Sequence, residues 1–249
     1  MPLHTTEAIV IGGHNLGEAD RIIPFFTRKL GKVRAVARGA RRVRSRYGGA
    51  LELFTLGQLV YFGWPNRTLH KINEFSVVEP FAALKADLGR LGRGAYLVEL
   101  AGVSVEEEEP NEEIFLLLRT ALTLLAAHDD PRLLRAFEIC LFRIVGYLLE
   151  LYRCLVCRSM LESHIEPAIS PTRGGLICSR CLSRAPDNVP ISMESLQFLR
   201  SVLHGGLEQS LALPLTHPHS TNLQEVLRAC IVHFFGKRLR SIAFLTLVE

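Results

Sequence analysis

Four cysteines in the second half of the chain have the spacing of a metal site. Cys154 and Cys157 form one CxxC pair, and Cys178 and Cys181 form another after an interval of 20 residues. Two thiolates three positions apart on a tight turn can reach one ion, and two such turns complete a tetrahedron of sulfur ligands. Because all four positions are cysteine, no ligand position stays open for water. We therefore predict one structural Zn²⁺ ion at these residues.

Other uses of paired cysteines fit the chain less well. A redox CxxC motif is expected near a βαβ pattern, and the sequence has none. Disulfides need an oxidising compartment, but the N-terminus MPLHTTEAIV has no basic region ahead of an apolar run, as a secretion signal would have. An iron–sulfur cluster remains an alternative. Three histidines have no ligand-like spacing and are expected in loops or on the surface: His164, His217 and His219.

A second group of residues that could bind a ligand lies at residues 28–46, RKLGKVRAVARGARRVRSR. This stretch is rich in Lys and Arg and contains no acidic residue. In an extended chain the basic residues of its first half point to one side and the apolar residues to the other. From Gly39 to Gly49 the stretch is expected to be a mobile loop. Charge of one sign gathered in this way suits a polyanion, although an ordinary solvated run is the alternative. We predict nucleic-acid contacts at these basic residues: Lys32, Arg34, Arg38, Arg41, Arg42, Arg44 and Arg46.

Composition supports a globular protein with an uneven charge. Apolar residues make up 48% of the 249 residues and charged residues 22%, which are ordinary values for folded domains. Residues 1–80 hold 12 Lys and Arg against 6 Asp and Glu, whereas the remainder holds 17 against 19. The most apolar window, residues 114–127, contains Arg119 and is shorter than the roughly 20 residues that span a bilayer. We expect a soluble cytoplasmic protein whose phosphate binding centres on the N-terminal part.

The first 80 residues have the pattern of a small β-barrel. Apolar and aromatic runs with turn residues between them recur at 7–11, 21–27, 32–38, 51–54, 58–62 and 69–78. Turns every 8–12 residues favour a barrel over a sandwich, and a five-stranded oligonucleotide-binding (OB) barrel is the leading candidate. Such barrels bind single strands by backbone charge and base stacking. Tyr47 and Trp64 are candidates for stacking, whereas aromatic residues in strands, such as Tyr61, are more often core.

The spacing of apolar residues becomes helical from residue 81, so the predicted fold class is α+β. We predict a barrel domain at 1–80 and a helical domain at 81–249, with the cysteine module at about 152–185. Expected helices include one over 84–105 that bends at its glycines, one over 114–126 capped by Asn111, and a buried, nearly all-apolar helix from Asp130 to about Tyr152. Ser192 caps a further helix, and Thr221 with Gln224 forms a capping box for the last. Cys140 and Cys230 are expected in the core, and Glu106–Glu109 as a solvated connection.

A catalytic constellation is missing from the sequence. It contains no GxxxxGK[ST] loop, no HExxH and no GxSxG motif. Asp20 and Glu52 are isolated, whereas two-metal nucleases need clustered carboxylates. The pattern therefore favours a nucleic-acid binder that is not an enzyme.

The chain resembles the RecO family of bacterial DNA repair and recombination mediators. The resemblance covers nearly the whole chain and is carried by EAIVIGGHNLGEADRIIPFFT, GKVRAVARGARR, LELF, CLVC with GGLICSRC, and LRSIAFL. The four cysteines are similar to those of the zinc-carrying members. The resemblance implies an OB barrel followed by a helical domain that holds the zinc module.

The resemblance also implies an activity and partners. Members bind single- and double-stranded DNA, anneal complementary strands without ATP, and act with RecR and RecF to load RecA onto strands coated by single-strand-binding protein. In the family, the helical domain receives the acidic tail of that protein. Because members act on chromosomal DNA, the resemblance also implies that this protein is located at the nucleoid. Basic residues beside the apolar helix could take the tail: Arg132, Arg135 and Arg143. Two alternatives remain: a zinc-containing RNA-binding or transcription-associated protein, and a nuclease or ligase accessory whose carboxylates converge only in the fold.

Overall fold

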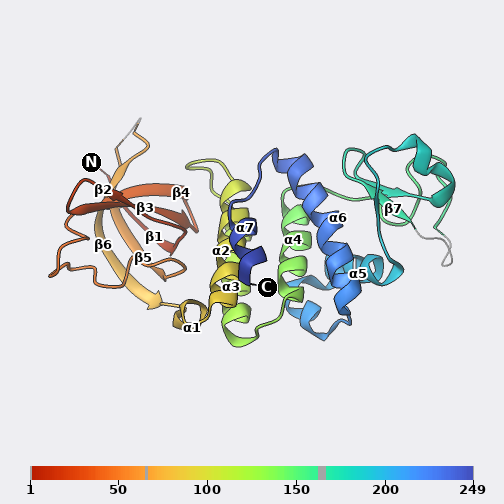
Figure 1. The fold of residues 1–249 in the computed structure, drawn as a ribbon. Helices are drawn as coiled ribbons and strands as arrows, with labels where there is room; N and C mark the ends of the chain where they lie inside the picture. Colours follow the sequence, from red (N-terminus) through yellow and green to blue (C-terminus); the bar gives the residue numbers. More distant parts are fainter. Residues whose placement is uncertain (1, 65–66, 162–166, 249) are drawn as a thin grey trace. The chain divides into compact units, whose positions relative to one another are not determined.

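The chain is represented by a computed structural model that describes residues 2–64, 67–161 and 167–248 (Figure 1). Part of the turn expected at residues 63–67 therefore lies outside the described residues, and so does part of the predicted cysteine module. His164 also lies outside them. Two compact units are present. The first comprises Met1–Asp129 with Leu239–Glu249, and the second Asp130–Arg238.

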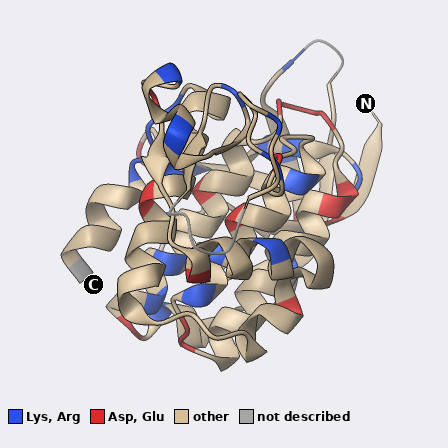
Figure 2. Cartoon of the chain, turned by 90° about the vertical axis from the view of Figure 1, so that its right-hand side faces the viewer, with Lys and Arg blue, Asp and Glu red and all other residues tan. Residues whose placement is uncertain are grey.

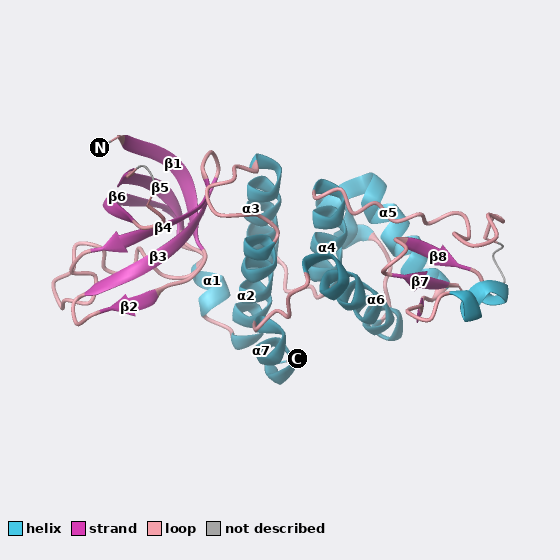
Figure 3. Ribbon diagram, turned by 90° about the horizontal axis from the view of Figure 1, so that it is seen from above, coloured by secondary structure: helices cyan, strands magenta, loops and turns pink. Residues whose placement is uncertain are grey.

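The first unit contains a closed five-stranded barrel, which confirms the predicted fold class (Figure 3). Its strands are β1 (Leu3–Val10), β3 (Asp20–Thr27), β4 (Gly31–Ala37), β5 (Leu56–Phe62) and β6 (His70–Glu79). They hydrogen-bond in the order β1-β5-β6-β4-β3, and β3 pairs with β1 to close the barrel. All of these pairings are antiparallel except that of β4 with β6. The short strand β2 (His14–Leu16) pairs with β3 and was not predicted.

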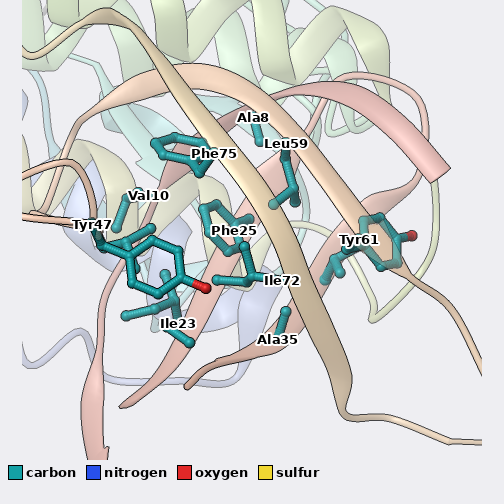
Figure 4. Close-up of a cluster of buried hydrophobic side chains, with 13 residues drawn as sticks. Ala8, Val10, Ile23, Phe25, Ala35, Tyr47, Leu59, Tyr61, Ile72 and Phe75 are labelled. Carbon is teal, nitrogen blue, oxygen red and sulfur yellow. The ribbon is translucent and has the colours of Figure 1, made fainter. Parts of the chain in front are cut away.

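The barrel core follows from the alternation of its strands. On β4 every second residue is buried, so that Val33, Ala35 and Ala37 face inward, as predicted. Phe25 from β3 and Phe75 from β6 meet with ring centroids 5.3 Å apart. Figure 4 shows Tyr47 and Tyr61 at opposite ends of the same buried cluster. Burial of these rings supplies much of the hydrophobic stabilisation of a small barrel.

The strand expected at residues 51–54 is absent, and this prediction was wrong. The segment Leu51–Phe54 consists of turns, and Phe54 adopts a left-handed conformation with φ of 72°. A positive φ is incompatible with an extended strand. The side chain of Phe54 is nevertheless fully buried, and it packs against Gly94 of helix α2. The apolar run therefore serves as a plug between the barrel and this helix.

Four helices complete the first unit: α1 (Ala82–Lys85), α2 (Leu88–Val103), α3 (Glu112–Ala127) and α7 (Ser241–Val248). The helix expected over 84–105 is divided, because Asp87 caps α2 by accepting a hydrogen bond from the Arg90 backbone N–H at 2.8 Å. Asn111 caps α3 through a hydrogen bond from the Ile114 N–H, as predicted. Helix α2 packs against α1, α3 and α7.

The second unit is built from α4 (Arg132–Ile144), α5 (Met193–Gln209) and α6 (His217–Phe235). A small antiparallel sheet joins β8 (Gly175–Ile177), β7 (Ala168–Ser170) and β9 (Val189–Pro190). Short 3₁₀ helices occupy Ser179–Arg184 and Ser210–Ala212. Every residue of α4 from Leu133 to Phe142 is buried, so this helix is the centre of the unit, as expected.

Lys and Arg are interspersed with Asp and Glu in the view of Figure 2.

Two helix boundaries differ from the sequence prediction. Helix α4 ends at Ile144 and not near Tyr152, since Gly146 takes a positive φ of 78° and turns the chain. Helix α6 begins at His217, with a proline in its first turn, so the expected capping box at Thr221 lies inside the helix. There the Thr221 hydroxyl donates to the His217 carbonyl oxygen at 3.3 Å. Ser192 caps α5 as predicted.

The change from strands to helices occurs at the predicted residue. Strand β6 ends at Glu79 and α1 begins at Ala82, whereas the compact units divide after Asp129. The division into domains at residue 80 stays a prediction. Among the helices of the described residues, none is both long and apolar enough to cross a bilayer.

Replacing Gly94 tests the close packing of α2 on the barrel. A Cβ atom at this position would lie 2.8 Å from the Phe54 ring, so we expect Gly94→Ala to destabilise the protein by about 1–3 kcal/mol, the usual cost of overpacking. In the same helix Gly102 has only Ile11 nearby, at 3.9 Å. Gly102→Ala should be neutral or stabilise by up to about 1 kcal/mol through helix propensity. Chemical unfolding midpoints compare the two, and equal effects would contradict the packing account.

Candidate nucleic-acid surface and metal centre

The outward face of β4 carries two of the predicted nucleic-acid contacts. Lys32 and Arg34 alternate with the inward residues of the strand and are partly exposed. Both lie near one carboxylate: Glu107 is 3.9 Å from the Lys32 Nζ and 3.4 Å from the Arg34 Nε. The positive face of this strand is therefore partly neutralised within the protein.

The loop that supplies Glu107 is held on the edge of β4. Strand β4 pairs with β6 only at Ala35 and Val36, which leaves its first residues without a strand on that side. Glu107 forms a parallel β-bridge with Lys32, and the Glu108 N–H donates to the Lys32 carbonyl oxygen at 3.0 Å. Gly31, with φ of 67°, contacts the Glu109 backbone so closely that no Cβ atom fits. The loop Glu106–Glu109 thus extends the barrel.

This contact was missed by the sequence analysis. The four glutamates are exposed, as a solvated connection would be, but two of their carboxylates pair with barrel side chains. The partners of these carboxylates lie far away in the chain, at Lys32, Arg34 and His70, so no local pattern could reveal the pairing. Their complementary charges were the only available indication.

Between β4 and β5 the chain forms a run of turns that carries the remaining basic residues. Backbone hydrogen bonds link Arg42 to Gly39, Ser45 to Arg42 and Ala50 to Tyr47, at 2.8–3.1 Å. The segment expected to be a mobile loop thus consists of hydrogen-bonded turns, and its mobility stays a prediction. We call it the arginine loop (residues 38–50). Its start is fixed by Asp20, whose Oδ1 accepts a hydrogen bond from the Gly39 N–H at 2.7 Å.

Apart from Arg46, the exposed arginines of this loop are Arg38, Arg41, Arg42 and Arg44. None of them has a carboxylate within ion-pair distance among the described residues. In the part of the chain that the structure describes, Arg41 is the one member of this set with a side-chain hydrogen bond, from its Nη1 to the Gly17 carbonyl oxygen at 2.9 Å. Their guanidinium groups are consequently available to an external anion.

Arg46 and Tyr47 have a structural role in the same loop. Tyr47 is only 6% exposed and belongs to the barrel core, so its ring offers no face to a base. The Arg46 guanidinium lies 4.8 Å from the centre of that ring and donates to the Tyr47 hydroxyl at 2.7 Å. This arrangement anchors the arginine loop to the barrel.

The four cysteines converge in the second unit. All of their Sγ atoms lie within 4.8 Å of one another, and those of Cys157 and Cys178 are 3.7 Å apart. Sulfur ligands of a tetrahedral ion at about 2.3 Å are separated by about 3.8 Å, so the cluster has the size of such a site. The Cys178 N–H also donates to the Cys154 Sγ at 3.4 Å, an interaction that favours a thiolate. These residues could hold a metal ion.

The local fold explains why both CxxC pairs are turns. In the first pair Arg158 takes a positive φ of 62°, and its N–H donates to the Cys154 carbonyl oxygen. In the second, the Cys181 N–H donates to the Cys178 carbonyl oxygen at 2.8 Å. Strands β7 and β8 form the hairpin that ends at Cys178. Each turn therefore presents its two sulfurs on one side.

The protonation of the cluster is uneven. A hydrogen bond with the Ser159 hydroxyl, whose oxygen is 2.9 Å from the Cys157 Sγ, lowers the pKa of the Cys157 thiol to about 6. Burial, together with the neighbouring sulfurs, raises the pKa of Cys181 to about 12. Four thiolates at this distance repel one another unless a cation lies between them. Metal binding at this site must therefore release protons.

The three arginines predicted to receive a partner's tail lie in different surroundings. Arg135 is 4% exposed and pairs with the buried Glu138 at 2.9 Å. Arg132 donates hydrogen bonds to both carboxylate oxygens of Asp130. Arg143 is exposed, and its Nη1 donates to the Leu203 carbonyl oxygen at 3.0 Å. Of the three, Arg143 is the most accessible to a partner.

The remaining sequence expectations concern single side chains. Cys140 and Cys230 are buried, as expected. His217 is exposed at the start of α6, and His219 lies near Ser192 and Glu194. Neither histidine belongs to the metal cluster found among the described residues.

Comparison with known proteins assigns the chain to a family. The family model described as "Recombination protein O N terminal" matches residues 1–81, and "Recombination protein O C terminal" matches residues 85–242. The chain belongs to the RecO family. This confirms the resemblance found in the sequence and supports a role in DNA repair and recombination.

Individual relatives are similar in sequence to this chain over nearly its full length. A DNA repair protein RecO from Anaeromyxobacter dehalogenans (strain 2CP-C) is 36% identical over 239 residues, which cover 95% of this chain and 93% of the relative. One from Roseiflexus sp. (strain RS-1) is 36% identical over 244 residues, covering 98% and 85%. One from Symbiobacterium thermophilum is 33% identical over 248 residues, covering 98% and 97%.

Removing one sulfur ligand tests the metal centre. We expect Cys178→Ser to lose most of its bound metal and to lower the unfolding temperature of the second unit, because binding energy at a closed site contributes directly to folding. Elemental analysis and thermal unfolding measure the two effects. Cys140→Ala, which alters a buried cysteine outside the cluster, should keep its metal. Full metal content with unchanged stability in Cys178→Ser would contradict a structural site.

Proposed function

We propose that this chain is a DNA repair and homologous recombination mediator that binds single- and double-stranded DNA and anneals complementary strands without ATP. The observation that carries the proposal is the arginine loop, which presents four exposed arginines without carboxylate partners among the described residues. Its position on an OB barrel supports binding of single strands. Membership in the RecO family supports the repair role.

The inferred mechanism is electrostatic. Arg38, Arg41, Arg42 and Arg44 neutralise phosphates and release condensed counterions, which lowers the repulsion between two strands. Lys32 and Arg34 join them only when a phosphate displaces the carboxylate of Glu107. Binding of this kind needs no nucleotide hydrolysis, and we infer no catalytic role for the chain. Because the arginines act only by binding the phosphates of the two strands, annealing proceeds without ATP.

The proposed partners come from the family. We infer that the chain acts with RecR and RecF to load RecA onto strands coated by single-strand-binding protein. Work on chromosomal DNA implies a location at the nucleoid. We also propose that residues 1–80 form the nucleic-acid domain and 81–249 the partner and metal domain, which is supported by family models that meet between residues 81 and 85.

We further propose a site for the acidic tail of single-strand-binding protein at Arg143. A small apolar pocket of about 50 Å³ lies beside it, lined among others by Phe142, Leu148 and Leu203. Leu203 is also the residue whose carbonyl oxygen holds the Arg143 guanidinium. An apolar pocket next to an exposed cation suits a peptide end that carries both a hydrophobic side chain and negative charge.

Zinc is the proposed ion of the cysteine cluster. Four thiolates in a closed tetrahedral arrangement suit Zn²⁺, and they leave no position for a water nucleophile. When bound, the ion supplies a cross-link between the two turns. The three strands of the second unit have only two or three residues each, so this cross-link would contribute to their stability.

Strand annealing tests the proposed function directly. Two complementary DNA oligonucleotides are coated with single-strand-binding protein, and duplex formation is followed by fluorescence without ATP. We expect the chain to accelerate annealing and to lose this effect at high salt. Tight binding to bare strands without acceleration would contradict the mediator role, and a preference for RNA over DNA would favour the RNA-binding alternative.

The salt dependence of binding locates the phosphate contacts. If roughly six contacts form, affinity should fall about 10³-fold or more between 50 and 200 mM salt. The triple variant Arg41→Ala, Arg42→Ala, Arg44→Ala should weaken binding to every sequence and lower the slope of log affinity against log salt by about 2–3. Fluorescence anisotropy with labelled oligonucleotides measures both quantities.

Two variants serve as comparisons in this experiment. A triple alanine variant at Arg228, Lys237 and Arg238 removes equal charge from the second unit and should leave the slope unchanged. Glu107→Gln frees Lys32 and Arg34, so it should strengthen binding and steepen the slope. An unaltered slope in the arginine-loop variant would exclude that loop as the phosphate site.

A charge reversal tests the proposed tail site. Arg143→Glu should weaken binding of a peptide with the tail sequence of single-strand-binding protein several-fold, because it replaces attraction to the acidic peptide by repulsion. Isothermal titration calorimetry measures the peptide, and affinity for bare DNA should not change. Arg153→Glu, an equal charge change at another exposed residue of the second unit, is the control. Equal losses in both variants would point to nonspecific electrostatics.

A further inference from the structure

A cavity of about 280 Å³ opens at one end of the barrel. Its lining includes His4 of β1, Tyr61 of β5 and His70 of β6, together with Trp64 and Glu108 from two loops. We call this set the aromatic pocket. Its volume lies just below the range of about 300–1,000 Å³ typical of sites for drug-sized ligands. Neither the arginine loop nor the metal centre contributes to it.

Contacts between neighbouring rings hold the side chains of the aromatic pocket in place. His4 stacks on Tyr61 with ring centroids 5.1 Å apart and planes inclined by 22°. Tyr61 meets His70 at 5.2 Å. Gly63 covers the His4 ring so closely that a Cβ atom there would lie 2.7 Å from it. Tyr61 and His70 are buried and form the floor, whereas His4 and Trp64 are only partly buried and have accessible ring surface.

The polar groups of the pocket have defined donor and acceptor roles. The Trp64 backbone N–H donates to the His70 Nδ1 at 3.4 Å, so the proton of the neutral ring is on Nε2. That nitrogen donates to the Glu108 Oε1 at 2.8 Å. Burial, and secondarily the Glu108 carboxylate, raises the pKa of Tyr61 to about 12, which keeps its hydroxyl protonated. The Glu108 side chain remains 57% exposed and can accept a further hydrogen bond.

A cation lies beside the accessible ring. The Arg67 guanidinium is 5.9 Å from the centre of the Trp64 ring and is exposed. Stacking surface, a carboxylate acceptor and a neighbouring cation match the three parts of a nucleotide that has an exocyclic amino group. The base stacks, its amino group donates to the carboxylate, and its phosphate contacts the cation.

We propose that the aromatic pocket binds one base of a single DNA strand and that Glu108 favours bases with an exocyclic amino group over thymine. Cytosine and adenine present an amino donor where thymine presents a carbonyl oxygen, which a carboxylate repels. The inference rests on the proposed function and adds to it a base-binding site with a chemical preference. DNA held at the arginine loop by charge alone has no such preference.

The chain carries its own reporter for this site. Trp64 is the only tryptophan of the 249 residues, so intrinsic fluorescence reports on the aromatic pocket. We would titrate the protein with dCMP and with dTMP at low salt, and in parallel measure anisotropy of labelled oligo-dC and oligo-dT of equal length. We expect quenching of Trp64 by both oligonucleotides, and binding of dCMP roughly fivefold or more tighter than dTMP.

Glu108→Gln separates the role of the carboxylate from that of the rings. The glutamine carbonyl still accepts from His70, so the fold is retained, while its amide N–H₂ can donate to the thymine carbonyl. The preference for dCMP should therefore disappear in Glu108→Gln and persist in the control Glu106→Gln, which changes the same charge outside the pocket. His4→Ala should weaken quenching by both mononucleotides, because it removes one stacking ring.

Each other outcome overturns a defined part of the inference. Equal affinity of the parent protein for dCMP and dTMP overturns the role of Glu108 and with it the proposed preference. Oligonucleotide binding seen by anisotropy without any change in Trp64 emission overturns the aromatic pocket but leaves the proposed DNA binding intact. An absence of both signals overturns the pocket and the proposed function together.

Discussion

Strands β4 and β6 of the barrel are joined by only two residue pairs, Ala35 with His70 and Val36 with Lys71. The first half of β4 is left with backbone groups that no strand satisfies, and such an edge invites pairing with another chain. The loop Glu106–Glu109 occupies this edge through the bridge at Lys32. The connection between α2 and α3 is thereby tied to the barrel, and its carboxylates are placed on both the basic strand and the aromatic pocket.

The position of this loop divides the basic residues into two groups. Lys32 and Arg34 lie against a carboxylate, whereas the arginine loop has none among the described residues. A phosphate reaching β4 must compete with Glu107, but one reaching the arginine loop meets no competitor. Under the proposed function, DNA therefore binds more tightly at the arginine loop than at β4, and the proposed base preference at Glu108 depends on the same Glu106–Glu109 segment.

The second unit is organised by a different constraint. Its three strands contain two or three residues each, and sheets of this size are marginal alone. The four sulfurs join two turns that are also linked by a hydrogen bond from the Leu155 N–H to the Leu176 carbonyl oxygen at 2.8 Å. Helix α4 supplies the hydrophobic centre of the unit, while a bound ion would hold the outer module in shape.

The sequence by itself determined the features with local patterns. Alternation on β4, the caps at Asn111 and Ser192, and the two CxxC pairs depend on neighbouring residues, so the barrel, two helix starts and the sulfur cluster were predictable. Only the tertiary structure decided the left-handed turn at Phe54, the early end of α4, and the pairing of Glu107 with Lys32 and Arg34. The burial of Phe54 against Gly94 and the pairing of Glu107 depend on partners far away in the chain, and packing and long-range charge leave no periodic pattern in neighbouring residues. The end of α4 depends on the conformation that Gly146 adopts, which the apolar pattern of the helix does not show.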